Sequence, residues 1–166
     1  MAQLRLIALV AFTACRASEA GPTSGLTPPA GWSALPALAT AAADAATKAN
    51  VTVDGVEAWG EPARGCYTAW IAIRGAGGTP SEIAEPMLAS LTTELPGLTT
   101  SDVIKPDPKA PDAGVLSLSF ARPPYHGMVR APIAKTGALA VVACFWNVRE
   151  PVACEAACSQ LIGSVK

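Results

Sequence analysis

Residues 138–146 read ALAVVACFW, a run without a polar side chain. A strand that buries one face alternates apolar and polar residues, whereas a strand that buries both faces is apolar throughout. The run is therefore predicted to be a central strand of a sheet. A helix is predicted to begin soon after it, at Pro151. The apolar stripe of this helix comprises Cys154, Ala157, Cys158, Leu161 and Val165.

Strand patterns also precede this central run. Leu116, Leu118 and Phe120 alternate with serine residues, which predicts a half-buried strand. Residues 127–135 predict another strand, placed at a sheet edge because Pro132 lacks the N–H group that a hydrogen-bonded ladder needs. Earlier strands are predicted at 51–59, 67–73 and 98–104.

Two further helices are predicted between these strands. An alanine-rich segment, 36–49, has proline in its first turn, where the missing N–H costs nothing. The second helix follows residues 79–82, Thr-Pro-Ser-Glu, which form a capping-box pattern. Pro86 is expected to kink this second helix or delay its start.

This order of elements predicts one α+β domain over residues 32–166. Its antiparallel sheet of about five to six strands packs against two or three helices. The body resembles the PsbP-like α/β sandwich in its Gly31-Trp32 entry, a helix after the first hairpin, and a late strand with Cys144 leading to a helix with Cys158 and Ser164. The alanine-rich helix before the first long strand departs from that pattern. The resemblance implies an accessory or binding domain that is not an enzyme.

The first residues have the pattern of an export signal. Arg5 is followed by the apolar run Leu6 to Phe12, too short to span a membrane permanently. Residues 12–15, Phe-Thr-Ala-Cys, resemble a bacterial lipobox. That resemblance implies a signal peptide at 1–14 and a lipid on Cys15. The alternative is cleavage before Gly21, which would release a protein without lipid.

A flexible tether is predicted between Cys15 and the body. Residues 16–30 are rich in Gly, Pro, Ser and Thr, and Leu26 is their single aliphatic residue. Such a composition buries too little apolar surface to order itself. Residues 15–31 are therefore assigned to a lipidated cysteine and its tether.

Four cysteines remain in the body of an exported chain, Cys66, Cys144, Cys154 and Cys158, enough for two disulfides. Cys154 and Cys158 lie one helical turn apart and project in the same direction, so a bridge between them is unfavourable. The preferred pairs are Cys144–Cys158 and Cys66–Cys154, and the exchanged pairing is the close alternative. Each pairing would fasten the last helix to two strands.

Other uses of these cysteines are disfavoured. A metal site made of Cys154, Cys158 and His126 lacks a fourth ligand, and a redox site needs two cysteines closer together at a helix start. Free buried thiols are a third alternative. No metal and no cofactor are predicted.

Catalytic signals are sparse. His126 is the only histidine, and no Gly-x-Ser-x-Gly motif presents a nucleophile to it. Trp32 and Trp70 are candidate binding residues because an exposed indole ring can stack on a partner. Trp59 and Trp146 are assigned to the core.

The charge balance gives no electrostatic reason to expect a nucleic-acid partner or attraction to an anionic membrane surface. The chain has 166 residues, a net charge of −1 and 15% charged residues, so it has no excess of basic side chains. The sequence therefore predicts a bacterial cell-envelope lipoprotein, anchored to a membrane by its lipid, with a partner-binding or accessory domain in the periplasm or extracellular space. The alternatives are a secreted hydrolase that uses His126 and a carrier of small apolar ligands.

Overall fold

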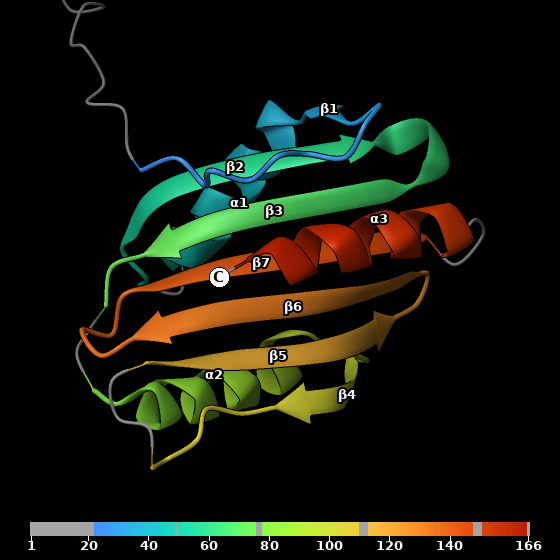
Figure 1. Ribbon diagram of the computed structural model, residues 1–166. Helices are drawn as coiled ribbons and strands as arrows, with labels where there is room; N and C mark the ends of the chain where they lie inside the picture. Colours follow the sequence, from blue (N-terminus) through green and yellow to red (C-terminus); the bar gives the residue numbers. More distant parts are fainter. Residues whose placement is uncertain (1–21, 49, 76–77, 110–112, 148–150, 166) are drawn as a thin grey trace, which may run out of the picture.

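The computed structural model describes residues 22–48, 50–75, 78–109, 113–147 and 151–165. These residues form an α+β fold with a seven-stranded antiparallel sheet in the order β1-β2-β3-β7-β6-β5-β4 (Figure 1). The strands are β1 (Ser33–Ala34), β2 (Val53–Glu61), β3 (Cys66–Ile73), β4 (Thr99–Ile104), β5 (Ala113–Arg122), β6 (Tyr125–Ala134) and β7 (Leu139–Asn147). The helices are α1 (Pro36–Lys48), α2 (Pro80–Glu94) and α3 (Pro151–Ser164), and a 3-10 turn, η1 (Pro62–Arg64), joins β2 to β3.

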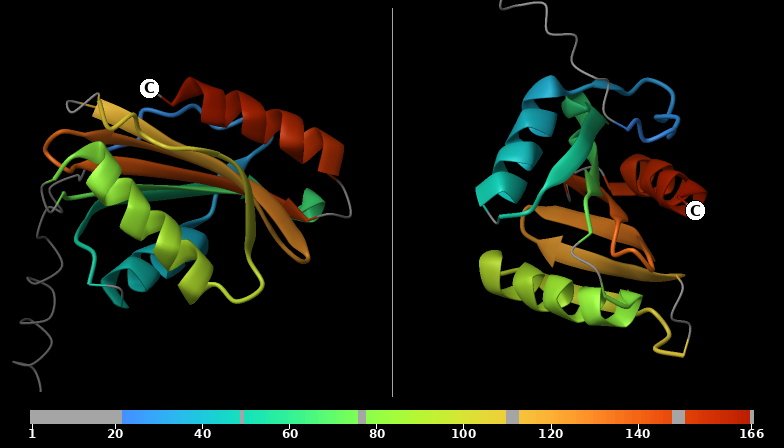
Figure 2. Two further views of the ribbon diagram at one scale, coloured as in Figure 1. Left: turned by 90° about the horizontal axis from the view of Figure 1, so that it is seen from below. Right: turned by 90° about the vertical axis from the view of Figure 1, so that its left-hand side faces the viewer.

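The two faces of the sheet carry different helices (Figure 2). α3 packs against β7 and β6 on one face, which we call the α3 face. α1 packs against β2 and β3, and α2 against β5 and β6, on the opposite face, which we call the two-helix face. Alternate residues of β7 divide between them, with Cys144 and Trp146 in the cluster beneath α3 and Leu139 and Val141 in the cluster beneath α2.

The central strand predicted at 138–146 is confirmed. β7 is the fourth of the seven strands and pairs with β3 on one side and β6 on the other. Val142 and Cys144 have no exposed surface on the α3 face, whereas Val141 and Phe145 are half-buried on the two-helix face. The strand is thus fully covered on the α3 face at Val142 and Cys144, and only partly covered on the two-helix face.

The edge position predicted for the strand with Pro132 is wrong. β6 lies inside the sheet, between β5 and β7. Pro132 pairs with Val115 of β5, but the pairing with β7 runs from Tyr125 to Arg130 and resumes only at Ile133. The sheet therefore tolerates the missing N–H group as a local gap in one ladder, while the rest of β6 keeps both neighbours.

The sheet has one strand more than the upper number predicted. The additional strand, β1, is two residues long and pairs Ser33 with Gly60 and Ala34 with Trp59 at the sheet edge. Two residues have no periodicity, so nothing in the local pattern could have indicated this strand.

The described part of the predicted tether, residues 22–31, is packed on the α3 face. Leu26 contacts both the cluster around the disulfides and the cluster around Trp70. The Ser24 hydroxyl donates a hydrogen bond to the carboxylate of Glu57. Composition predicted a flexible segment here. Leu26 is enough to hold the segment in place because α3 and the sheet already form a surface on which it packs. The prolines also lower the entropy that the segment loses on ordering. Residues 1–21, including the predicted signal peptide and Cys15, lie outside the described residues.

The capping box predicted at the start of α2 is present, and Pro86 does not delay that start. The Thr79 hydroxyl accepts a hydrogen bond from the Glu82 N–H at 3.3 Å, and the Thr79 N–H donates to the Glu82 carboxylate at 2.8 Å. The Thr79 N–H and the Thr79 hydroxyl both donate to the Glu82 carboxylate, and these two bonds lower the pKa of Glu82 below its ordinary value of 4.5. The contribution of the Glu82 charge to stability is therefore present above pH 4.5 and is lost as the pH falls through the lowered pKa.

Replacing Thr79 by alanine should lower the free energy of unfolding by about 1 kcal/mol, because the Glu82 N–H loses its partner. Urea unfolding at neutral pH measures the change. Thr93→Ala is the matched control, since the Thr93 hydroxyl bonds back to the Ala89 carbonyl within the same helix and caps nothing. Equal losses in the two variants would contradict a capping role for Thr79.

Candidate functional site

Three aromatic side chains meet on the two-helix face. Tyr67 of β3 lies opposite Phe145 of β7, and Tyr125 begins β6 beside the last residues of β7. The Tyr67 and Phe145 rings are stacked, with centroids 5.4 Å apart, and the Tyr125 ring meets Phe145 edge-on at 5.9 Å. Offset-stacked and edge-on arrangements are the favourable ones for aromatic pairs. The three rings therefore form a packed aromatic cluster at one end of the sheet.

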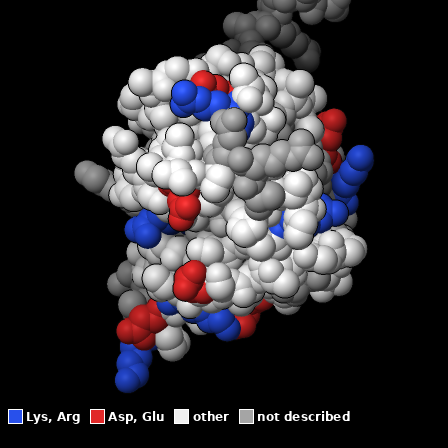
Figure 3. Space-filling view, turned by 90° about the vertical axis from the view of Figure 1, so that its right-hand side faces the viewer, with Lys and Arg blue, Asp and Glu red and all other residues white. Residues whose placement is uncertain are grey.

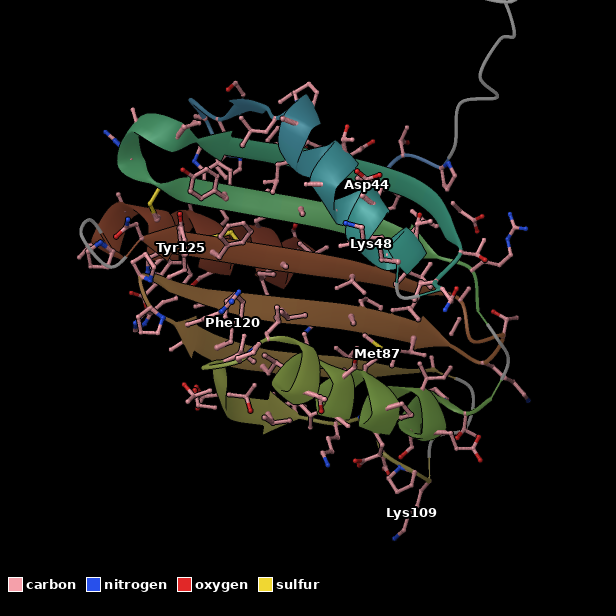
Figure 4. All side chains as sticks on the ribbon, turned by 180° about the vertical axis from the view of Figure 1, so that it is seen from behind. Asp44, Lys48, Met87, Lys109, Phe120 and Tyr125 are labelled. Carbon is pink, nitrogen blue, oxygen red and sulfur yellow. A yellow bond between two sulfur atoms is a disulfide. The ribbon has the colours of Figure 1, made fainter. Side chains whose placement is uncertain are left out.

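The helices on this face leave the cluster accessible. α1 covers β2 and β3 and α2 covers β5 and β6, so β7 lies between them without a helix of its own (Figure 4). Tyr125 is 37% exposed, a large value for an aromatic residue that also packs on two other rings. The strip of sheet between α1 and α2 is thus open to solvent at its aromatic end.

A pocket of about 450 Å³ opens beside these rings. This volume lies within the range of small-molecule and side-chain binding sites. Its walls come from α1, the segment before it, η1 and the aromatic cluster. The lining residues are Leu35, Pro36, Ala37, Leu38, Pro62, Tyr67, Tyr125 and Phe145. The walls are apolar apart from two phenol hydroxyls, which have no hydrogen-bond partner among the described residues and could donate to a bound molecule.

Two disulfides support the pocket from the opposite face. The structure joins Cys66 to Cys154 and Cys144 to Cys158, with Cα–Cα distances of 5.4 and 5.5 Å. These are the preferred pairs of the sequence analysis, and all four cysteines are at most 1% exposed. The bridges fasten α3 to β3 and β7.

The bridged cysteines are the immediate neighbours of the pocket rings. Cys66 precedes Tyr67, and Cys144 precedes Phe145. Because successive side chains of a strand point to opposite faces, each bridge holds its strand at the position where an aromatic ring projects from the other side. The covalent bonds thus constrain the backbone beneath the two stacked rings.

Because the bridges join all four body cysteines, they contradict both the metal-site and the free-thiol alternatives. The sulfur atoms of Cys154 and Cys158 are bonded to other cysteines, so they are not thiolates for a metal. Within the described ranges no group of three or more metal-ligating side chains is found. His126 lies elsewhere, exposed on β6.

His126 belongs to a second, smaller pocket of about 290 Å³ on the α3 face. Ser119 and Glu155 line the same pocket. His126 pairs with Ala121 across the β5–β6 ladder, and Ser119 is two residues further along β5. Diagonal neighbours of this kind lie about 7–8 Å apart, a separation that long side chains can still bridge. The His126 side chain makes no hydrogen bond with any of the described residues.

The tryptophans lie outside the aromatic pocket. Trp70 is 5% exposed and packs with Val142 and Val165, so it presents no free ring to a partner. Trp32 is half-buried against the disulfide cluster. Trp146 is in the core, as predicted, whereas Trp59 is only half-buried and packs at the edge of the cluster formed by Trp70, Val142 and Val165.

The three pocket rings were not singled out from the sequence. Alternation along β3, β6 and β7 shows that Tyr67, Tyr125 and Phe145 each occupy one face of a strand. Which of these faces is shared depends on strand order. The only local signal was that Tyr67 and Phe145 each follow a cysteine whose partner lies in the same helix.

Comparison with family models and with curated protein sequences gives no match for this chain. Among the described residues, no helix has the length and apolar character needed to cross a membrane. Two buried disulfides are typical of proteins in oxidising compartments outside the cytosol.

Proposed function

We propose that this chain is a bacterial cell-envelope lipoprotein, anchored by a lipid on Cys15, whose domain binds a partner through the aromatic pocket. The observation that carries the binding role is the open pocket with Tyr125 at its rim, held from behind by two disulfides. An accessory or binding role is also what the resemblance to the PsbP-like sandwich implies. The export signal and the lipobox-like residues 12–15 support the anchor.

The position of the pocket favours binding of a partner at a distance from the membrane. The described chain begins at Pro22, which lies beside Asp54 and Ile73 where β3 ends; we call this the entry end of the sheet. The pocket lies at the other end of the sheet, where Tyr67 is the second residue of β3. Tyr67 and Ile73 are six positions apart along β3, about 20 Å at the rise of an antiparallel strand. An anchor at Cys15 would therefore leave the pocket end directed into the envelope space.

The chemistry of the pocket favours a protein segment with aliphatic or proline side chains. Apolar and aromatic walls bind such side chains by excluding water, and phenol hydroxyls can donate to backbone carbonyls of an extended peptide. The pocket end carries scattered charges of both signs on a largely uncharged surface (Figure 3). Such a surface gives no preference for a strongly acidic or basic partner.

The anchor is tested by the intact mass of the protein extracted from membranes. We expect the chain to begin at Cys15 and to carry diacylglycerol on it, and Cys15→Ala should move the protein out of the membrane fraction, since two or more acyl chains give stable anchoring. A mature chain that begins at Gly21 would exclude lipidation.

The pocket is tested by photo-crosslinking in cells with a photoreactive amino acid at Tyr125. A discrete adduct should form there and be absent with the same probe at Ile104, which is 63% exposed on β4. Ala37→Glu, which places a carboxylate in the pocket wall, should reduce the adduct several-fold.

Ala45→Glu is the matched control, because Ala45 is also exposed on α1 but does not line the pocket. It should leave the adduct unchanged. An adduct that forms equally at Ile104, or that both glutamate variants weaken to the same extent, would refute binding at the pocket.

A further inference from the structure

The α3 face has a hollow at the entry end that α3 does not cover. Val165, just after α3, packs on Trp70 and Val142. Two residues further along the same strands, Ala72 and Ala140 line an open hollow of about 620 Å³. The helix thus ends just before the hollow, and its floor faces solvent.

The hollow is almost wholly apolar. Val115 and Pro132 continue its floor on β5 and β6, and Ala134 and Ala138 form its rim at the turn between β6 and β7. Asp54 is the charged residue in its lining, and the Arg74 guanidinium pairs with that carboxylate. The pairing offsets the negative charge, and Lys135 is exposed at the same turn.

The chain enters the fold at this hollow. Pro22, the first described residue, is itself part of the lining. Seven peptide units separate Pro22 from Cys15, so the extended chain between them reaches at most about 25 Å. A lipid on Cys15 would therefore hold the hollow within about the length of one strand from the bilayer surface.

We propose that this hollow is a membrane-contact surface that lies against the lipid headgroups beside the anchor. The inference rests on the lipidation proposed above. Exposed apolar surface close to a lipid anchor is what peripheral proteins bury at the boundary between headgroups and acyl chains. Contact at the entry end would orient the sheet and direct the aromatic pocket away from the membrane.

The test uses the mature protein extracted from membranes and reconstituted into vesicles of phosphatidylethanolamine and phosphatidylglycerol. A photoreactive amino acid is placed at Ala134, on the rim of the hollow, or at Val152, which is 80% exposed at the start of α3 at the opposite end. Lipid adducts should be several-fold more abundant from Ala134 than from Val152. Equal yields, or more adduct from Val152, would overturn the proposal.

A second measurement places the photoreactive amino acid at Ala113, which also lines the hollow. Ala138→Glu should lower its lipid adducts several-fold because the new carboxylate would have to approach anionic lipid. Ala63→Glu, at the exposed turn η1 of the pocket end, should leave the yield unchanged. Equal effects of the two substitutions would also overturn the proposal.

The intact mass separates this inference from the one on which it rests. With lipid present on Cys15, failure of the crosslinks rejects the contact surface and leaves the anchor standing. A chain without lipid on Cys15 rejects the anchor, and the contact surface falls with it.

Discussion

Replacing Cys66 and Cys154 together by alanine should lower the free energy of unfolding by about 4–5 kcal/mol. The bridge spans 88 residues of sequence, and in the chain-entropy treatment a crosslink stabilises more when it closes a longer loop of the unfolded chain. Urea unfolding at neutral pH without reductant measures the loss. Since small domains have only about 5–15 kcal/mol of stability in total, this variant should be close to unfolding at 37 °C.

The second bridge supplies the matched control. Cys144→Ala with Cys158→Ala opens a loop with a sequence separation of only 14, so the loss should be about 3 kcal/mol. All four cysteines are equally buried, and the cavities left by alanine are therefore similar. A larger loss from the shorter loop would contradict the entropic explanation and indicate that local packing around Cys144 dominates.

Trp70→Ala should cost about 3–5 kcal/mol of the free energy of unfolding, the usual loss when a large aromatic side chain is removed from a core. Trp70 is 5% exposed and packs on Val142 and on Val165 after α3. Thermal or urea unfolding of the purified variant measures the change.

Trp32→Ala is the comparison for that variant, because Trp32 is only half-buried against the disulfide cluster. Its loss of stability should be clearly smaller. If Trp70→Ala left stability unchanged, the position of Trp70 in the core would be wrong, and its ring would again be a candidate for binding.

Local patterns were sufficient for most of the secondary structure. The alternation around Leu116 and Leu118, the apolar run 138–146 and the capping box at Thr79 each correspond to an element of the fold. The edge position predicted from Pro132 was wrong. A missing N–H group shows where one ladder hydrogen bond is absent, but whether the strand lies at an edge depends on which strands pair with it.

The residues of the candidate site could not be predicted from local sequence patterns. Tyr67, Tyr125 and Phe145 are separated by 58 and 20 residues in sequence, and each is an ordinary strand residue in its own context. Likewise, the segment around Leu26 has the composition of a linker, and it packs only because α3 and the sheet present a surface to it.

The amino-acid pattern alone specifies the three helices, the six longer strands and the half-buried faces, and it disfavours a bridge between Cys154 and Cys158. It does so because periodicity and helix geometry act over a few residues. The insertion of β7 between β3 and β6, and with it the shared face of the three rings, arises only in the folded molecule. Strand order is set by the packing of distant segments, and no local interaction encodes which strands become neighbours.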